Sequence, residues 1–575
     1  MSNENQDNLN VTQSAYDVLS DYAARWLESK MRDCEGQELA RLIALLRVAD
    51  MHAQPVNARS PLPFDPAFKE RIMHGAAVFI PKLLPRVPPG AEFNRGDTNR
   101  ELAAWAETTL NEAGALSFAR RAAFAEKFGL SVCRFLPGGQ ISIAPGPADL
   151  EAQENLDRNT VNDWERILTA NTWQEAHRRL LEQIAQLGTS YKGLSNGALI
   201  IFPHDDAYFT AQRKVLELNA REYVESESFP NHVRLGPLAF GEWKQVAVGI
   251  AAHISIGANQ AIYAAKRRGL APCALLNLLP RFLDEDSTRN LILASTSSVD
   301  ASFVDQVLEV FTTDAGDAAR FEKIYMPPPA MMVRVPGGYV VSHNANVQNP
   351  YWYMTEKLKT LFRDQWRNAA SDRDLREVEF RRQLYAVLPP PAYVVGKNTI
   401  LRQPDGKEIT DIDATLYERV TNVVYLFQLK WPDVSAGEWN RRRNETGRLV
   451  DEGVKWINGV FKWFEQHQGP AQKELLAMLE LDKTVTSPYS VRYELVVITR
   501  SWARFAGMGT FDSRAAWTSW TRLRKLILQH SPSHSPLKNA WTELCDPKPP
   551  RARRTRPSVV ELPELTLSFD LPLEK

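Results

Sequence analysis

The sequence contains little cysteine. Four of its 575 residues are cysteines, at Cys34, Cys133, Cys273 and Cys545, and no two of them form a CxxC pair. Such scattered cysteines argue against a disulfide framework and against a zinc-binding cysteine cluster. A reducing, cytoplasmic environment is therefore the expected location of the protein.

Long apolar runs are also missing. The stretch MSNENQDNLN at the start is polar, so we expect no signal peptide. The most apolar stretch, Val246–Ala265, contains His253, Asn259 and Gln260, and such polar groups are costly in the middle of a bilayer. This stretch therefore predicts a buried helix, and we expect no membrane-spanning segment.

Several common catalytic motifs are absent. The chain has no GxxxxGK(S/T) loop, no GxGxxG after a predicted strand and no GxSxG elbow, which argues against a P-loop ATPase, a dinucleotide enzyme and an α/β-hydrolase. The run His204-Asp205-Asp206 has no spaced His and Asp partners of the kind that an HD-type phosphohydrolase needs. We interpret it as a helix cap in a loop.

The charge is balanced overall but unevenly distributed. The chain has 69 Lys+Arg and 69 Asp+Glu; residues 361–575 hold 33 and 27 of them, so residues 1–360 hold 69−33 = 36 and 69−27 = 42. The net charge is thus +6 in the C-terminal part and −6 in the rest. A mildly basic C-terminal part permits an anionic partner there without requiring one.

Changes in periodicity divide the chain into four parts. Residues 1–190 are mainly helical, residues 191–370 mix helix and strand patterns, residues 371–546 have a regular order of elements, and the Pro- and Arg-rich tail 547–575 is expected to be flexible. The helices predicted in the first part are Tyr16–Arg32, Leu39–Ala49, Glu101–Ala113 and Val161–Ala185.

The middle part carries mixed signals. They predict a strand at Ala198–Phe202, helices at Phe240–Arg268 and Asp300–Phe311, a hairpin around Pro336-Gly337-Gly338, and a helix that begins at Asn349-Pro350. The third part reads helix, strand, strand, strand, helix, strand, helix, over the ranges Leu375–Leu388, Tyr393–Leu401, Glu408–Tyr417, Val423–Lys430, Glu438–Gln466, Arg492–Thr499 and Ser513–His530.

Two strands of the third part carry the chemistry. The strand Val423–Lys430 is apolar except at its end, where Gln428 and Lys430 lie two residues apart and hence on one face. Asp413 precedes Gln428 by 15 residues, a spacing that suits two antiparallel strands joined by a short turn. We therefore expect Asp413 to lie near Gln428 and Lys430.

These residue types suit phosphodiester hydrolysis with a divalent cation. Asp413, the side-chain carbonyl of Gln428 and the backbone carbonyl of Leu429 are hard oxygen ligands for Mg²⁺ or Mn²⁺. Lys430 can orient the attacking water or stabilise the charge that develops on the phosphate.

The element order, with Asp on the second strand and Gln-x-Lys on the third, resembles the PD-(D/E)XK nuclease superfamily; the stretches TDIDA and QLKW also resemble a group of uncharacterised bacterial proteins. The likeness covers about 160 residues. It implies an α/β (α+β), restriction-endonuclease-like C-terminal domain with a central mixed sheet flanked by helices, beside a large, mainly helical N-terminal region. It also implies metal binding by Asp413 and Gln428 and a catalytic role for Lys430.

The superfamily often adds a glutamate from the first helix. Glu377 shares a helical face with Phe380, Leu384 and Leu388, so it is our first choice for a further catalytic and metal-binding residue, and Glu379 is the second. Gln428 departs from the common pattern, because a neutral ligand attracts a cation less than Asp or Glu does. Active Gln-x-Lys branches of the superfamily exist.

A basic cluster follows the motif. Arg441, Arg442, Arg443 and Arg448 open the next helix and are candidates for binding DNA phosphates, although interspersed acids such as Glu445 also fit a solvated helix face. The abundant tryptophans nearby are expected mainly in the core rather than stacked on bases.

The sequence thus predicts a Mg²⁺-dependent nuclease that cleaves DNA. A separate N-terminal region suggests a role in restriction or anti-phage defence, by analogy only, with a partner protein of a multi-component system and a homodimer as open possibilities. Two alternatives remain: a catalytically inactive nuclease fold that binds nucleic acid or acts as a scaffold, and a repair or recombination nuclease for branched DNA.

Overall fold

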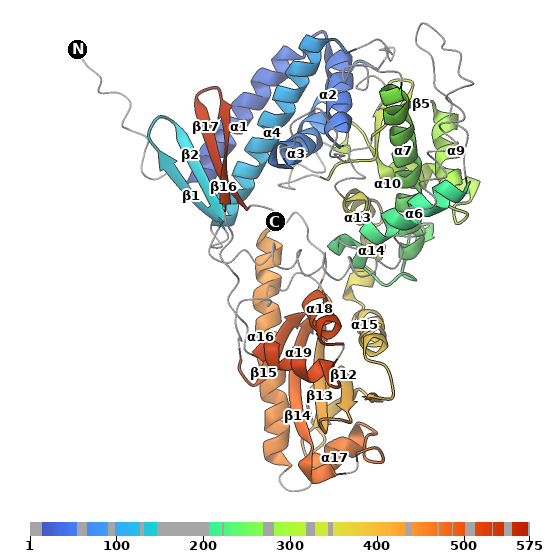
Figure 1. Cartoon of the computed structure of the whole chain (residues 1–575), viewed down its shortest axis with the longest axis vertical. Helices are drawn as coiled ribbons and strands as arrows, with labels where there is room; N and C mark the ends of the chain where they lie inside the picture. Colours follow the sequence, from blue (N-terminus) through green and yellow to red (C-terminus); the bar gives the residue numbers. More distant parts are fainter. Residues whose placement is uncertain are drawn as a thin grey trace, which may run out of the picture.

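A computed structural model describes most of the chain, and its described residues form a mixed α/β fold (Figure 1). The described residues are 14–53, 66–89, 98–126, 131–145, 206–220, 223–267, 281–317, 328–342, 349–432, 439–467, 471–485, 487–500, 512–531, 533–545 and 555–572. The helix predicted at 161–185 and the strand predicted at 198–202 lie outside them.

Four packed helices open the chain. They are α1 (Ala15–Asp33), α2 (Glu38–Ala53), α3 (Pro66–Leu83) and α4 (Arg100–Glu126), with the short 3₁₀ turn η1 (Leu84–Arg86) after α3. Glycine lets α3 and α4 approach closely: a Cβ atom on Gly75 would lie 1.9 Å from the carbonyl oxygen of Leu110, and one on Gly114 equally close to that of Arg71. The three helices predicted within these ranges are confirmed.

The last strands of the chain fold back onto this helical region. Strands β1 (Ser131–Leu136), β2 (Gln140–Pro145), β16 (Thr555–Leu562) and β17 (Leu565–Pro572) form one sheet in the order β1-β2-β17-β16. Strand β17 runs parallel to β2, and its Leu567 and Phe569 join the core of the four helices. Figure 1 shows the red hairpin beside the cyan one.

The prediction of a flexible tail at 547–575 is therefore wrong for residues 555–572. Apolar side chains alternate along both strands and are buried against the helices, at Val560, Leu562, Leu565, Leu567 and Phe569. The prolines and arginines that precede this segment hid the alternation, which is the pattern of a strand with one buried face.

The middle region packs around the long helix α7 (Phe240–Arg267). Its other elements are α6 (Asp206–Ala220), η2 (Val224–Glu227), β3 (Arg234–Leu235), β4 (Leu238–Ala239), β5 (Arg281–Leu283), α9 (Glu285–Ser295), η3 (Ala301–Phe303), α10 (Val304–Phe311), β6 (Thr312–Thr313), β7 (Met332–Val335), β8 (Gly338–Val341), α13 (Pro350–Leu361) and α14 (Arg363–Ser371). Strands β5-β8-β7-β6 form a sheet in that order.

Helix α7 is a core helix, as its sequence predicts. Trp243, Val246 and Ile250 are fully buried against the rest of the middle region. Among the residues that the structure describes, no helix is both long enough and apolar enough to span a bilayer. The hairpin predicted around Gly337 is confirmed as β7–β8, and Asn349 caps α13, where its side chain accepts a hydrogen bond from the Tyr351 N–H.

The C-terminal region is built on a five-stranded mixed sheet. Its elements are α15 (Arg373–Val387), β9 (Tyr393–Gly396), β10 (Thr399–Arg402), β11 (Glu408–Ile412), β12 (Ala414–Glu418), β13 (Val423–Lys430), α16 (Trp439–Gln466), α17 (Ala471–Met478), η4 (Pro488–Ser490), β14 (Arg492–Thr499), β15 (Ala515–Ser519), α18 (Trp520–His530) and α19 (Pro536–Cys545).

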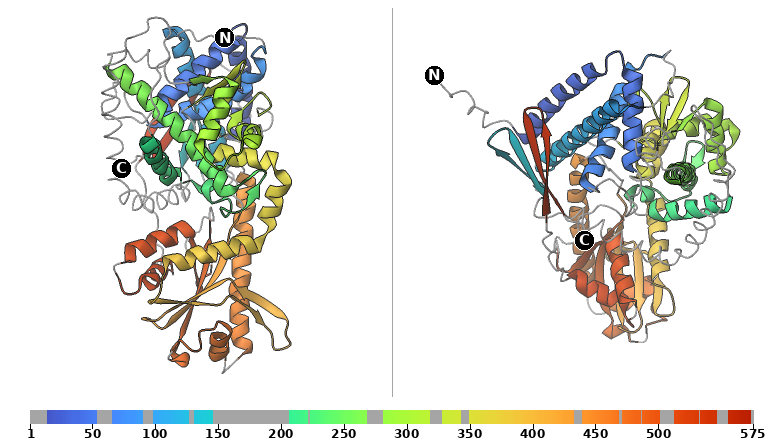
Figure 2. Two further views of the ribbon diagram at one scale, coloured as in Figure 1. Left: turned by 90° about the vertical axis from the view of Figure 1, so that its right-hand side faces the viewer. Right: turned by 45° about the horizontal axis from the view of Figure 1, so that its top comes forward.

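The strand order is β15-β14-β13-β12-β9, with antiparallel pairs on the β9 side of β13 and parallel pairs on the β15 side. Helices cover both faces (Figure 2). Val424 and Leu426 of β13 face α16 and α17, whereas Tyr425 and Phe427 face α15, α18 and α19. Both faces of β13 are therefore buried, which explains its nearly continuous apolar run.

Three predicted elements of this region differ from the observed ones. The strand predicted at Tyr393–Leu401 is two strands, β9 and β10, and that at Glu408–Tyr417 is divided at Asp413 into β11 and β12. Strands β10 and β11 form a separate ribbon that packs on α16. The first part of the helix predicted at Ser513–His530 is strand β15, and Ser519 caps the helix that follows.

Candidate functional site

Asp413 lies at the junction between β11 and β12. Its backbone N–H donates to the carbonyl oxygen of Phe427 at 3.1 Å. Its carboxylate Oδ2 accepts hydrogen bonds from the backbone N–H of Leu429 at 2.7 Å and from the side-chain amide of Gln428. The side chain is nearly buried, with 3% of the residue exposed. The strand hairpin thus brings Asp413 and Gln428 together, as their spacing predicts.

The last three residues of β13, Gln428, Leu429 and Lys430, carry the polar groups that surround Asp413. Gln428 and Lys430 share the face of β13 that packs toward α16, since side chains two residues apart in a strand point the same way. The Leu429 N–H points to Asp413, and the carbonyl of a strand residue lies on the same side as its N–H. The Leu429 carbonyl, the Gln428 amide and the Asp413 carboxylate therefore converge.

Burial and neighbouring acids make the charged form of Asp413 costly. Burial raises the pKa of Asp413 to about 8, the charges of Glu377 and Asp411 add to the effect, and the Leu429 N–H and Lys430 oppose it. Burial also raises the pKa of Glu377, followed by the charge of Asp411, while Lys430 lowers it. The three carboxyl groups are therefore close enough to repel one another.

The two candidate glutamates of α15 have different surroundings. Glu377 is half-buried and interacts electrostatically with Asp411, Asp413 and Lys430. Glu379 instead forms an ion pair with Arg382 one turn along the helix, at 2.7 Å, and this pairing lowers the pKa of its carboxyl group. The geometry brings Glu377, and not Glu379, to Asp413.

Lys430 has an acidic partner on the covering helix. Its Nζ atom lies 3.2 Å from the Oε2 atom of Glu452 on α16, and Arg448 lies 3.8 Å from the other oxygen of the same carboxylate. Lys430 and Arg448 thus share the Glu452 carboxylate as a partner, and the role of Arg448 in phosphate binding stays a prediction. Helix α16 includes Arg441, Arg442 and Arg443, whose side chains lie outside the description.

Three arginines complete the surroundings and were missed from the sequence. Arg381 donates to the backbone carbonyl of Asp413, and Arg376 donates to the backbone carbonyl of Trp431 at 3.1 Å. The guanidinium of Arg500 lies over the ring of Trp431, 4.8 Å from its centroid. The position of Arg381 one helical turn after Glu377 was a usable signal, but nothing in the sequence links Arg500 to the motif.

The donor set fits a hard divalent cation through mixed oxygen ligands. Within the described residues, no group of three or more His, Cys, Asp or Glu side chains is arranged to hold a metal ion. Other polar groups gather here as well: the carboxylates of Asp413 and Glu377, the backbone carbonyl of Leu429, and the Gln428 amide, which turns its nitrogen toward Asp413 and could offer its oxygen after a rotation. Oxygen donors of these kinds bind Mg²⁺ and Ca²⁺ in proteins, and a cation would relieve the carboxylate repulsion.

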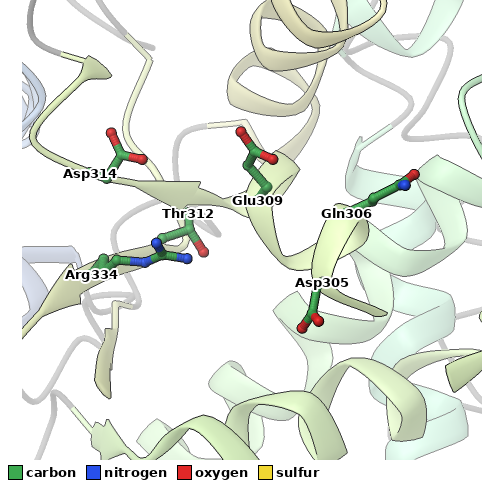
Figure 3. A pocket seen from close by; sticks show the side chains of 6 residues that line it. All are labelled: Asp305, Gln306, Glu309, Thr312, Asp314 and Arg334. Carbon is green, nitrogen blue, oxygen red and sulfur yellow. The ribbon is translucent and has the colours of Figure 1, made fainter. Parts of the chain in front are cut away.

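A separate hollow of about 360 Å³ lies on the middle region (Figure 3). It is lined by Asp305, Gln306, Glu309, Thr312, Asp314 and Arg334. Arg334 donates to the Tyr339 hydroxyl at 3.1 Å, and Asp305 forms an ion pair with Arg289 at 2.6 Å. Its lining belongs to α10 and the β5–β8 sheet region, and it shares no residue with the Asp413 site.

Comparisons with known proteins found no matching family model, no matching curated protein and no matching solved structure.

Proposed function

We propose that residues 371–546 form a restriction-endonuclease-like domain of the PD-(D/E)XK type that cleaves DNA with Mg²⁺ or Mn²⁺. The convergence of Asp413, Gln428 and Lys430 at the ends of β12 and β13 carries this proposal. Two antiparallel strands followed by a parallel strand, with helices on both faces, support the fold assignment. A role in restriction or anti-phage defence is proposed on the fusion to a large N-terminal region alone.

Each residue has a role that its position supports. Asp413 and Glu377 supply carboxylate oxygens, Gln428 its amide oxygen after a rotation that turns Oε1 toward Asp413, and Leu429 its backbone carbonyl. A divalent cation held there would polarise the phosphate and lower the pKa of a bound water. Lys430 would orient that water or stabilise the developing negative charge. Binding of DNA would require Lys430 to exchange Glu452 for the phosphate.

Cleavage of DNA by the purified protein tests this proposal. We expect cutting of plasmid or linear DNA with Mg²⁺ or Mn²⁺, and a loss of about 10²–10³-fold or more in rate for each of two variants. Asp413→Asn weakens the binding of the cation, and Lys430→Ala removes a positive charge beside the reacting phosphate. The variants Asp482→Asn and Lys483→Ala change exposed residues of the same region and should keep full activity.

A second candidate is supported by one contact. The Gln428 amide donates a hydrogen bond to the Asp413 carboxylate, which therefore has a partner without a cation. This favours a nuclease fold that binds nucleic acid without cutting it. Titration calorimetry separates the two functions. Heat of Mg²⁺ or Mn²⁺ binding that Asp413→Asn abolishes supports the enzyme, whereas retained DNA binding with no metal heat supports the scaffold.

A further inference from the structure

The middle region contacts the end of the motif strand through three consecutive residues. These residues, Glu227, Ser228 and Phe229, are here called the 227–229 segment; Glu227 ends the turn η2, and the other two follow it. They lie against residues that directly follow or precede the proposed site residues. Trp431 comes after Lys430, and Arg376 comes before Glu377. Contacts across more than 140 residues of sequence thus meet at the site.

The 227–229 segment is firmly anchored in the middle region. Phe229 has 2% of its surface exposed, and its ring meets Trp366 and Phe240 edge-on, with centroids 4.7 Å and 5.8 Å apart. Lys244 of α7 donates to the carbonyl of Ser226 at 3.1 Å. The position of the segment therefore follows the position of the middle core.

On the other side, the segment holds Trp431 and Arg500. The indole N–H of Trp431 donates to the backbone carbonyl of Glu227 at 2.8 Å, and the Glu227 carboxylate forms an ion pair with Arg500 at 3.2 Å. Both side chains of this pair are largely buried, at 14% and 6% exposed. Arg500 in turn donates its backbone N–H to the Lys430 carbonyl at 2.7 Å.

The segment also reaches the helix that carries Glu377. Arg376 donates to the carbonyl of Ser228 at 3.4 Å, and its guanidinium lies 4.8 Å from the centroid of the Phe229 ring. The same guanidinium donates to the Trp431 carbonyl at 3.1 Å. Arg376 therefore links the 227–229 segment, α15 and the end of β13 in one network.

We propose that the 227–229 segment is a positioning element that sets the end of β13 and the start of α15, and through them Lys430 and Glu377, for the proposed reaction. This inference rests on the proposed function for its kinetic consequence, but its structural part does not. Glu227, through Arg500 and Trp431, and Phe229, through Arg376, act on the site without contact with the substrate. A movement of residues 206–371 is thereby transmitted to two site residues on different elements.

Two conservative variants test the inference. Glu227→Gln weakens the buried ion pair, and Trp431→Phe removes one N–H donor while it keeps a ring beside Arg500. We expect kcat to fall about tenfold or more in each, since misplaced reacting groups slow the chemistry, with KM for DNA changed less than twofold. Glu480→Gln breaks an exposed ion pair with Lys397 in the same region and serves as the matched control.

Hydrogen exchange gives a readout that needs no cleavage. We expect amide exchange of residues 373–380 and 423–431 to become at least tenfold faster in both variants, with strands β16 and β17 unchanged. If the wild type cuts no DNA, the proposed function fails and this measurement still decides the inference. Unchanged exchange in both segments, equal acceleration throughout the protein, or unchanged kcat in an active enzyme would each overturn it.

Discussion

At the scale of single residues, the candidate site combines burial with like charge. The carboxyl group of Asp413 is buried beside Glu377 and Asp411, and its pKa is raised to about 8. Two N–H donors, from Leu429 and Gln428, stabilise it. The neutral amide at position 428 therefore has a structural benefit, because a fourth acid in this place would add to the repulsion.

The variant Gln428→Glu tests this balance. It replaces an N–H donor with a carboxyl group, so we expect the protein without divalent cations to lose about 1–3 kcal/mol of stability. Mg²⁺ should raise the unfolding temperature of the variant by more than it raises that of the wild type, because a cation between two carboxylates relieves their repulsion. Calorimetry with Mg²⁺ and with EDTA measures both effects.

Gln466→Glu is the control for that experiment, since Gln466 is exposed at the end of α16. Identical responses of the two variants to Mg²⁺ would argue against residue 428 as part of a cation site.

A buried histidine far from the site predicts a dependence of stability on pH. Burial, and then the charge of Arg121, lowers the pKa of His74 from 6.5 to about 3. His74 therefore becomes protonated near pH 6.5 in the unfolded chain, but only near pH 3 in the folded chain. Acidification from pH 8 to pH 5 should cost about 2 kcal/mol of folding free energy through this group alone.

His74→Phe should flatten that part of the pH profile, since phenylalanine has no proton to bind and the ring of Phe118 already packs edge-on against residue 74, with centroids 4.5 Å apart. Chemical denaturation at pH 8 and pH 5 measures the difference. An equal loss of stability on acidification in wild type and variant would show that His74 does not stay neutral.

At the scale of elements, helix α16 packs tightly against the sheet at Gly453 but faces open space at Gly447. A Cβ atom on Gly453 would lie 2.4 Å from the ring of Trp517, whereas one on Gly447 would meet no atom within 4 Å. Alanine is a better helix former than glycine by about 1 kcal/mol. Alanine should therefore increase the stability of the protein at position 447 and decrease it at position 453.

We expect Gly447→Ala to stabilise the protein by about 0.5–1 kcal/mol and Gly453→Ala to destabilise it by about 1–3 kcal/mol through overpacking. Urea unfolding curves of the two variants measure both values. A stabilising Gly453→Ala would mean that Trp517 moves away from the helix at little cost.

The contacts that could be predicted from the sequence join residues that are close together in the chain. The pairing of Asp413 with Gln428 spans 15 residues of a hairpin, so spacing and alternation were enough to predict it. The division of the strand at Asp413 was not predictable, because it depends on the separate ribbon β10–β11 that α16 covers. The ion pair between Glu227 and Arg500 spans 273 residues, and periodicity carries no information about such a contact.

At the scale of the whole molecule, residues 131–145 and 555–572 share one sheet. Strands β16 and β17 are separated from β2 by the entire middle and C-terminal regions, yet β17 pairs with β2 along Gln140–Ile143. Tyr22 of α1 donates to the Pro563 carbonyl, and Arg71 of α3 donates to Ser558 at 3.0 Å. The helical region is therefore completed by residues from the far end of the sequence.

Deletion of residues 546–575 should destabilise the N-terminal helices although it leaves them intact in sequence. It removes Leu567 and Phe569 from their core and exposes the partner edge of β2. Limited proteolysis should then cleave within residues 14–145 faster in the deletion variant, with residues 439–467 protected as before. Equal protection of residues 14–145 in both proteins would contradict the structural role of the hairpin.

The same sheet has a consequence during protein synthesis. Because domains generally fold as the nascent chain emerges, N-terminal first, the helices α1–α4 leave the ribosome long before the strands that complete their core. We expect them to stay in an open state until residues 555–572 are translated. A chain that lacks residues 555–572 should keep that core open, and we expect proteases to cleave it faster than a chain that includes them.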